Sequence, residues 1–208
     1  MRRKIREVGL SEMVRQNNLI APQQQEEFSK QAIEKFLVFC MSKSDSNMLL
    51  WSHYADSHRG ISIGVRVFAS EKAQSLMMKL AATENECLIN FEYPVVHIDY
   101  YPENAEIPYF KHFTGEHEDL MRYLQTKSYD WRYEQEYRLI LWDEIVHSQE
   151  LFLPDNGIPE VIFGCKVPHQ IIKKTLDEVN KKNIQYGNIK FYKMEMEKNR
   201  YALKKISI

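Results

Sequence analysis

The chain has 208 residues, of which 44% are hydrophobic and 27% are charged, and its formal net charge is −1 at pH 7. This composition is that of a folded protein and excludes a disordered chain, and the near-zero net charge gives no general attraction to nucleic acid or membranes. No run of about 18 apolar residues occurs, so the sequence predicts no membrane-spanning helix. The basic start, residues 1–6, lacks the apolar stretch of a secretory signal, and we therefore expect a cytoplasmic protein.

The first third of the chain is predicted to pass from helices to strands. Residues 5–19 and 23–34 carry apolar side chains at helical spacing, with a break at Pro22. The apolar run 36–41 predicts a buried strand, and 48–58 predicts a short helix that ends at Gly60.

Residues 61–68 alternate between two faces, as a strand does. Ile61 and Ile63 share the apolar face, whereas Gly60, Ser62 and Gly64 share the other. Three small residues on one face leave room for a close neighbour, which we expect to be packed protein more often than a ligand.

The rest of the chain mixes both element types. Helices are predicted over residues 71–83, 115–126 and 169–182, and strands over residues 95–101, 133–142, 160–164, 189–194 and 201–206. Together these elements predict an α+β fold with a mixed or mostly antiparallel sheet and helices packed on it. We expect a single domain over residues 1–208, with residues 1–35 as a helical N-terminal extension and 36–208 as the core.

Charge and cysteine usage add two expectations. From Lys166 to the end there are eleven Lys or Arg against four Asp or Glu. We expect a lysine-dotted helix and edge strands here, while binding of a polyanion such as nucleic acid stays open. Cys40, Cys87 and Cys165 form no CxxC pair, and the apolar runs around Cys40 and Cys165 predict buried free thiols.

Two blocks of sequence carry a family resemblance. One is the run Trp51–Asp56 followed by Gly60, and the other is Lys127, Trp131 and the run Tyr133–Arg138. Together they resemble the uncharacterised bacterial family called domain of unknown function 2971, over about residues 36–208. The resemblance implies no settled activity, and it implies a mobile-element or phage-defence setting. Members usually open with an additional segment that this chain lacks, so we expect a shortened variant or a fragment.

The predicted strand 133–142 holds the first candidate site. A two-residue period places Glu134, Glu136 and Arg138 on one face, with the two carboxylates about 7 Å apart. Such a pair suits divided roles, one ionised and one with a raised pKa, and Arg138 could hold Glu136 or an anion. The alternative is a solvated row of charges that pair across strands.

The second candidate site is the Trp51–Asp56 block. On a helix, His53 and Asp56 are three residues apart and can face together, so that the carboxylate would orient the imidazole. A histidine that braces backbone is an equal alternative. Trp51 and Trp131 are more often core residues than ligand platforms. The histidine and cysteine spacings do not fit a metal site.

These residues support two functional hypotheses. The first is an enzyme acting on a nucleotide-like substrate, because the Glu-x-Glu pair is similar to that of ADP-ribosyltransferase-like toxins. By that likeness Glu136 would be the catalytic carboxylate and Glu134 would position the acceptor, while His53, the third catalytic candidate, and Tyr54 would contact the dinucleotide. The substrate-binding candidates are Tyr54, Arg138, Trp131, Trp51 and Asp56.

A phosphodiesterase or nuclease that uses a divalent ion ranks lower. The second hypothesis is a non-catalytic sensor or partner-binding module. The enzyme needs both carboxylates accessible in a cleft, whereas the module predicts that they are closed by internal pairs. No cofactor can be inferred from the sequence, and a homo-oligomer stays open.

Overall fold

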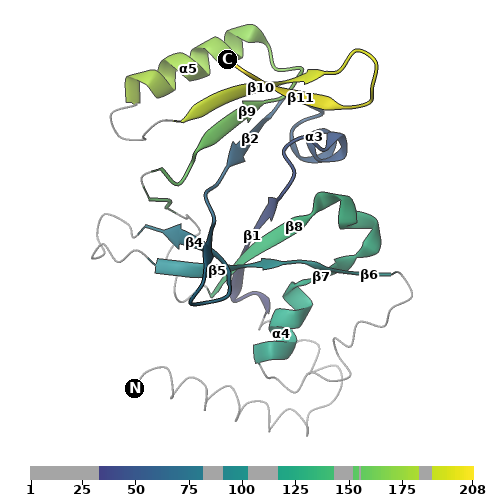
Figure 1. Cartoon of the computed structure of the whole chain (residues 1–208), viewed down its shortest axis with the longest axis vertical. Helices are drawn as coiled ribbons and strands as arrows, with labels where there is room; N and C mark the ends of the chain where they lie inside the picture. The colour runs from purple at the N-terminus through teal and green to yellow at the C-terminus, as the bar shows by residue number, and fades with distance from the viewer. Residues whose placement is uncertain (1–32, 82–90, 103–116, 143–151, 155, 183–188) are drawn as a thin grey trace, which may run out of the picture. The chain divides into compact units, whose positions relative to one another are not determined.

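The computed structural model describes residues 33–81, 91–102, 117–142, 152–154, 156–182 and 189–208. Helices and mixed sheets are both present, so the predicted α+β class is confirmed (Figure 1). The described residues form two compact units, and the chain passes between them more than once. The extent of the domain therefore stays a prediction, and the helices expected at 5–19 and 23–34 lie outside the described residues.

The first unit holds residues 33–41, 96–102, 117–132 and 136–142. Its elements are most of β1 (Phe36–Ser42), the end of β5 (Phe91–His97), β6 (Asp99–Tyr101), α4 (His117–Leu124), β7 (Thr126–Ser128), most of the 3₁₀ helix η1 (Tyr129–Glu134) and β8 (Glu136–Trp142). In its sheet β8 lies between β1 and β5, and β6 pairs with β7 in parallel. Leu139 and Leu141 are buried on one face of β8, which leaves Glu136 and Arg138 on the other.

The second unit holds residues 42–81, 91–95, 133–135, 152–154, 156–182 and 189–208. Its main sheet has the order β11-β10-β9-β2. These strands are β2 (Ile61–Gly64), β9 (Glu160–Phe163), β10 (Lys190–Met196) and β11 (Leu203–Ser207). A hairpin of β3 (Phe68–Ser70) and β4 (Ser75–Leu80) continues into the start of β5.

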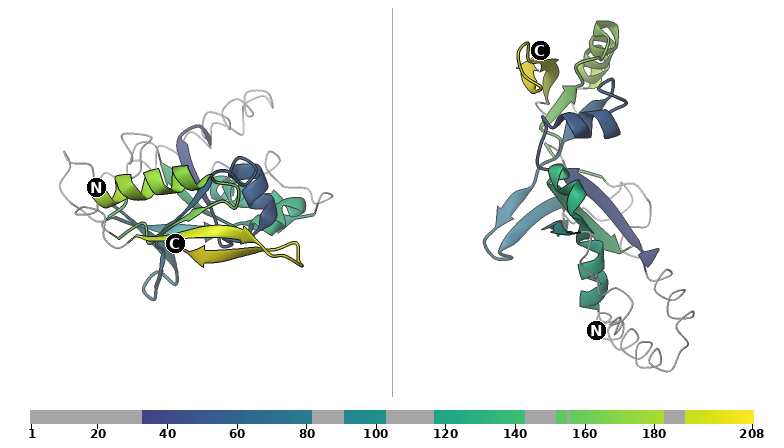
Figure 2. Two further views of the ribbon diagram at one scale, coloured as in Figure 1. Left: turned by 90° about the horizontal axis from the view of Figure 1, so that it is seen from above. Right: turned by 90° about the vertical axis from the view of Figure 1, so that its right-hand side faces the viewer.

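Two helices cover opposite faces of this four-stranded sheet. Trp51 of α3 (Met48–Tyr54) packs against Ile162 and Met194, whereas Ile172 of α5 (His169–Lys182) packs against the neighbouring Phe163. Since Ile162 and Phe163 are consecutive on β9, they point to opposite faces. Figures 1 and 2 show α5 beside the β9–β10 part of the sheet.

The start of helix α3 is set by its N-cap residue, Asn47. The Asn47 side chain accepts hydrogen bonds from the backbone N–H of Leu49, at 2.9 Å, and Leu50. The helix ends at Tyr54 and not at His58 as predicted, because Asp56, Ser57 and His58 all adopt positive φ.

Several predicted elements are confirmed. Helix 169–182 has the predicted bounds, and the helix over 115–126, the strand over 160–164 and the closing antiparallel strand pair are present with small shifts. Residues 95–101 form two strands, β5 and β6, which are separated at the buried Ile98.

Two element predictions are wrong. Within the helix expected over 71–83, residues 75–80 form the strand β4, because pairing with β3 and β5 outweighs the helix-forming tendency of its Leu, Met and Lys residues. The strand expected over 133–142 begins only at Glu136, because η1 runs to Glu134 and Gln135 has a φ of 45°.

The small-residue face of β2 packs against protein, as expected. A Cβ at Gly60 would lie 3.0 Å from the Ala55 backbone, and one at Gly64 would lie 2.6 Å from the Glu160 side chain. The same strand, at the edge of its sheet, exposes Ile61 and Ile63, at 47% and 50%. The predicted alternation is confirmed over Ile61–Gly64, where the strand ends, but the apolar face is the exposed one.

Gly164 gives a test of how tightly the second unit is packed. A Cβ at this position would overlap the carbonyl oxygen of His58. We expect Gly164→Ala to lower the free energy of unfolding by about 1–3 kcal/mol, measured by urea denaturation. Gly60→Ala, which needs a shift of only a few tenths of an ångström, is the graded control. Equal stability of the two variants would contradict this packing.

Candidate functional site

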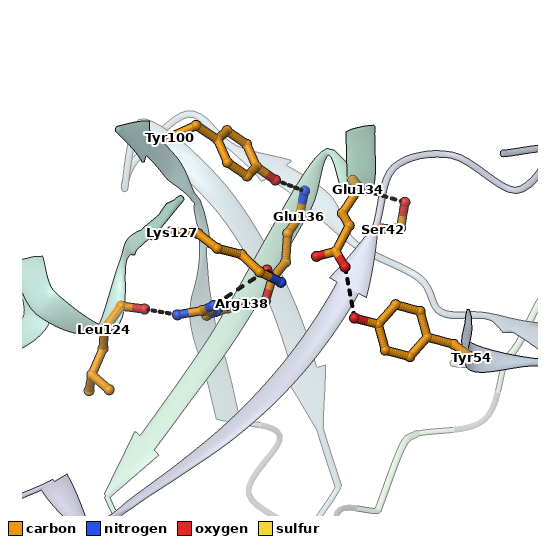
Figure 3. A network of polar contacts seen from close by, with 8 residues as sticks. All are labelled: Ser42, Tyr54, Tyr100, Leu124, Lys127, Glu134, Glu136 and Arg138. Atoms are coloured by element: carbon orange, nitrogen blue, oxygen red, sulfur yellow. Dashed lines mark hydrogen bonds and ion pairs between the residues drawn. The ribbon is translucent and has the colours of Figure 1, made fainter. Parts of the chain in front are cut away.

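Glu136 is the centre of a charged network in the first unit (Figure 3). It stands at the start of β8 and is 3% exposed. Its carboxylate accepts hydrogen bonds from Arg138 Nε at 2.7 Å, from Arg138 Nη2 at 3.3 Å and from Lys127 Nζ at 2.9 Å. Arg138 Nη1 also donates to the carbonyl oxygen of Leu124, at the end of α4. One buried carboxylate thus joins β8, β7 and the end of α4.

The network sets the ionisation of Glu136. Burial by itself would raise the pKa of this carboxyl, but hydrogen bonds from Arg138, Cys40 and Lys127 lower it to about 2. The backbone N–H of Glu136 donates to the Tyr100 hydroxyl at 2.8 Å, which fixes the start of the strand. The carboxylate is therefore ionised at neutral pH and cannot serve as a general acid there.

Cys40, on β1, is the neutral member of the network. Its residue is exposed, so the predicted buried thiol is wrong for this position; Cys165 is half-buried, and Cys87 lies outside the described residues. Partial burial of the thiol, together with the hydrogen bond to Glu136, raises the pKa of Cys40 to about 11. The thiol is protonated at neutral pH and is a poor nucleophile.

Glu134 belongs to the second unit and has a different environment. It is 4% exposed, at the end of η1. Its carboxylate accepts a hydrogen bond from the Tyr54 hydroxyl at 2.7 Å, and its carbonyl oxygen accepts one from the Ser42 hydroxyl at 2.6 Å (Figure 3). Glu134 and Glu136 therefore do not share a strand face, which corrects the two-residue period assumed for them.

The histidine block is only partly assembled as predicted. His53 is exposed on the last turn of α3, with its ring centroid 6.4 Å from that of Tyr54 and 6.5 Å from that of Tyr133. Asp56 lies beyond the helix end and pairs with Arg59 at 3.7 Å, so it does not share a helical face with His53. The pairing of His53 with Asp56 on one helix is therefore wrong.

The two tryptophans of the signature lie in different environments. Trp51 is 3% exposed in the core of the second unit, and its indole N–H donates to the Asp45 carbonyl at 2.6 Å, which favours the structural alternative. Trp131 is 39% exposed on η1, and Lys127 Nζ lies 5.0 Å from its ring centroid.

Several participants were not identified as site residues from the sequence. They are Cys40, Tyr100, Lys127, Tyr129 and Arg132, of which only Lys127 stood in the family signature. The spacing of Tyr129 and Arg132, three apart, would have paired them on a helix, but the sequence did not predict a helix there. Cys40 and Tyr100 reach Glu136 only through strand pairing, for which the sequence has no local signal.

No group of three or more His, Cys, Asp or Glu residues in the described part of the chain lies close enough to hold a metal ion. In that same part, none of the helices has the length and apolar character needed to cross a membrane.

Glu136→Gln tests the charged network. We expect a loss of about 2–3 kcal/mol in the free energy of unfolding at neutral pH, because the two half-buried cations Lys127 and Arg138 lose their carboxylate. The stabilisation by Glu136 is present above its ordinary pKa of 4.5 and is lost as the pH falls towards about 2. The variant should therefore lose less stability than the wild type across this interval in pH-dependent urea denaturation.

Glu92→Gln is the matched control, because Glu92 forms an exposed ion pair with Lys79 at 3.5 Å. Its effect should stay below about 1 kcal/mol. A Glu136→Gln variant as stable as this control would show that the network does not stabilise the fold.

Tyr54→Phe tests the second carboxylate. Loss of the hydroxyl leaves a buried oxygen of Glu134 without this donor, and we expect a cost of about 1–2 kcal/mol in thermal or urea unfolding. Tyr201→Phe is the control, because Tyr201 is 96% exposed. If both changes have the same small effect, the Tyr54–Glu134 hydrogen bond contributes nothing to stability.

Comparison with known proteins adds one match. No curated protein and no solved structure matches the chain. Residues 50–139, which hold both signature blocks, match the family described as protein of unknown function (DUF2971). The resemblance drawn from those blocks is thereby confirmed, and over these residues the chain carries the sequence pattern of the DUF2971 family.

Proposed function

We propose that this protein is a non-catalytic binding module whose ligand is nucleotide-like. The observation that carries this proposal is a contrast within one short stretch of chain. Glu134 and Glu136 are 4% and 3% exposed, whereas Tyr129 and Trp131, a few residues before them, are 49% and 39% exposed. The charged groups expected to do chemistry are buried, and the groups able to bind a ligand are exposed.

The enzyme hypothesis requires something different of the two carboxylates. A glutamate that stabilises an oxocarbenium-like transition state must reach the ribose of its substrate. Glu136 instead has its two oxygens occupied by Arg138 and Lys127, and Glu134 accepts from Tyr54. Breaking these contacts would leave buried charges without partners, which is costly. The closed pairs are what the binding-module hypothesis expected.

The exposed stretch has the chemistry of a nucleotide site. Lys127 Nζ lies 5.0 Å from the ring centroid of Trp131, and the guanidinium carbon of Arg132 lies 4.3 Å from that of Tyr129. Arg132 Nη1 also donates to the Tyr129 carbonyl at 3.3 Å, which restricts the side chain before any ligand binds. Since Lys127 is paired with Glu136, the exposed Arg132 is the cation of this stretch that can attract a phosphate. A ring that stacks on a base, beside such a cation, matches the two parts of a nucleotide.

A sensor with this surface suits the mobile-element or defence setting that the family resemblance implies. In such a role the bound ligand changes the partner interactions of the module, and no bond of the ligand is broken. The exposed His53 and Tyr54 of the second unit then remain candidates for contact with a partner.

Calorimetric titration with ATP, GTP and NAD⁺ tests the proposal. We expect at least one of them to bind, and Trp131→Ala and Arg132→Ala each to weaken binding about tenfold or more, since stacking and charge both contribute. Tyr201→Ala and Arg59→Ala, which remove an exposed ring and an exposed cation from the second unit, are the matched controls and should bind as the wild type does.

Two results would overturn the proposal. One is unchanged affinity in both Trp131→Ala and Arg132→Ala, or no binding of any of the three nucleotides. The other is conversion of a bound nucleotide to product by the wild type but not by a folded Glu136→Gln variant, which would restore the enzyme hypothesis.

A further inference from the structure

The turn between α3 and β2 has an unusual backbone. Asp56, Ser57 and His58 have φ values of 44°, 51° and 73°, all in the left-handed region. L-residues adopt this region at a cost in free energy, although Asp and His tolerate it better than most. Three such residues in succession persist only where the surrounding structure holds them. We call residues 56–58 the latch turn.

Backbone contacts of the second unit hold the latch turn. The N–H of His58 donates to the Trp51 carbonyl at 3.0 Å, and the carbonyl of His58 accepts from the N–H of Lys166 at 3.1 Å. The N–H of Gly164 donates to the Gly60 carbonyl at 3.0 Å, and a Cβ at Gly164 would overlap the His58 carbonyl oxygen. The latch turn therefore connects the end of α3 to the segment between β9 and α5.

The His58 ring does not fit this place when it is charged. Its Nδ1 is buried and has no hydrogen-bond partner among the described residues. A protonated imidazole needs an acceptor at each nitrogen, and leaving one N–H buried without an acceptor is costly. Proton uptake by the ring therefore opposes the closed arrangement of the turn.

The charges around the ring act in the same direction. Lys166, which follows β9, is the cation that acts on His58. Asp56 on the turn pairs with Arg59, the residue after it, at 3.7 Å, and their side chains are 76% and 59% exposed. Trp51 of α3, whose carbonyl accepts from the His58 N–H, and Ala55, which follows the helix, carry no charge. Burial lowers the pKa of His58 below its ordinary value of 6.5, and Lys166 lowers it further.

We propose that the latch turn is a pH-sensitive catch, closed while His58 is neutral and released when His58 takes up a proton. Well above pH 6.5 both the closed and the open arrangement hold a neutral ring, and the turn has its full stability. Below that value the open arrangement binds the proton first, so the closed one is progressively lost. Release of the turn frees the end of α3, which bears His53 and Tyr54. The catch does not depend on the proposed nucleotide site.

Solution NMR of the whole chain tests this catch without any ligand. We expect the His58 ring to titrate below its ordinary value. After correction for intrinsic rates, the amides of His58, Gly60 and Lys166 should exchange with solvent about tenfold faster at a pH of about 5 than at about 7.5.

Two variants separate the catch from a general loss of stability in acid. His58→Asn tolerates the left-handed backbone but does not titrate, so the pH dependence of exchange at Gly60 and Lys166 should disappear. Lys166→Gln should raise the pKa of His58, whereas Lys166→Arg, which keeps the charge, should not. The proposal is overturned if His58 titrates at or above its ordinary value, if exchange at these amides is independent of pH, or if His58→Asn keeps the wild-type pH dependence.

Discussion

The burial of the Glu136 carboxylate is the constraint on which the first unit depends. A carboxylate that is 3% exposed is tolerable only if its charge is matched and its oxygens are hydrogen-bonded. Arg138 supplies two hydrogen bonds from the same strand, and Lys127 supplies one from β7. Because Arg138 also bonds the end of α4, the requirement to match one charge fixes the positions of three elements. A purely apolar core would not impose directions of this kind.

Gln135 explains why two glutamates only two positions apart have unrelated roles. Its φ of 45° separates the 3₁₀ helix from the strand, so the two-residue period of a strand does not extend to Glu134. Glu134 then accepts hydrogen bonds from the hydroxyl groups of Tyr54 and Ser42, which also belong to the second unit. Each carboxylate therefore forms its hydrogen bonds within its own unit. The left-handed backbone of Gln135, between the two glutamates, makes this separation possible.

The sequence predicted the elements whose pattern is set by a nearby apolar surface. Helix 169–182 has apolar side chains at helical spacing because it covers one face of a sheet, and Ile172 and Leu176 belong to the cluster around Phe163 on that face. The amphipathic spacing over residues 71–83 predicts a helix, whereas the backbone of residues 75–80 pairs with strands on both sides. Strand pairing joins residues far apart along the chain, and a local pattern does not contain it.

In the candidate site too, the local sequence indicates which residues matter, whereas their partners come from distant parts of the chain. Sequence pattern and family resemblance selected Glu134, Glu136 and Arg138 as residues of consequence, and these residues do lie in polar networks. A carboxylate is either accessible to a substrate or hydrogen-bonded within the protein, and which of the two holds depends on its partners. Cys40 is one such partner, and strand pairing brings it to Glu136. A pair of acidic residues in a family signature can therefore indicate a structural ion pair just as well as a reactive site. The two are distinguished by exposure, because a buried ionised carboxylate with bonded oxygens stabilises the fold but has little capacity left to bind a substrate.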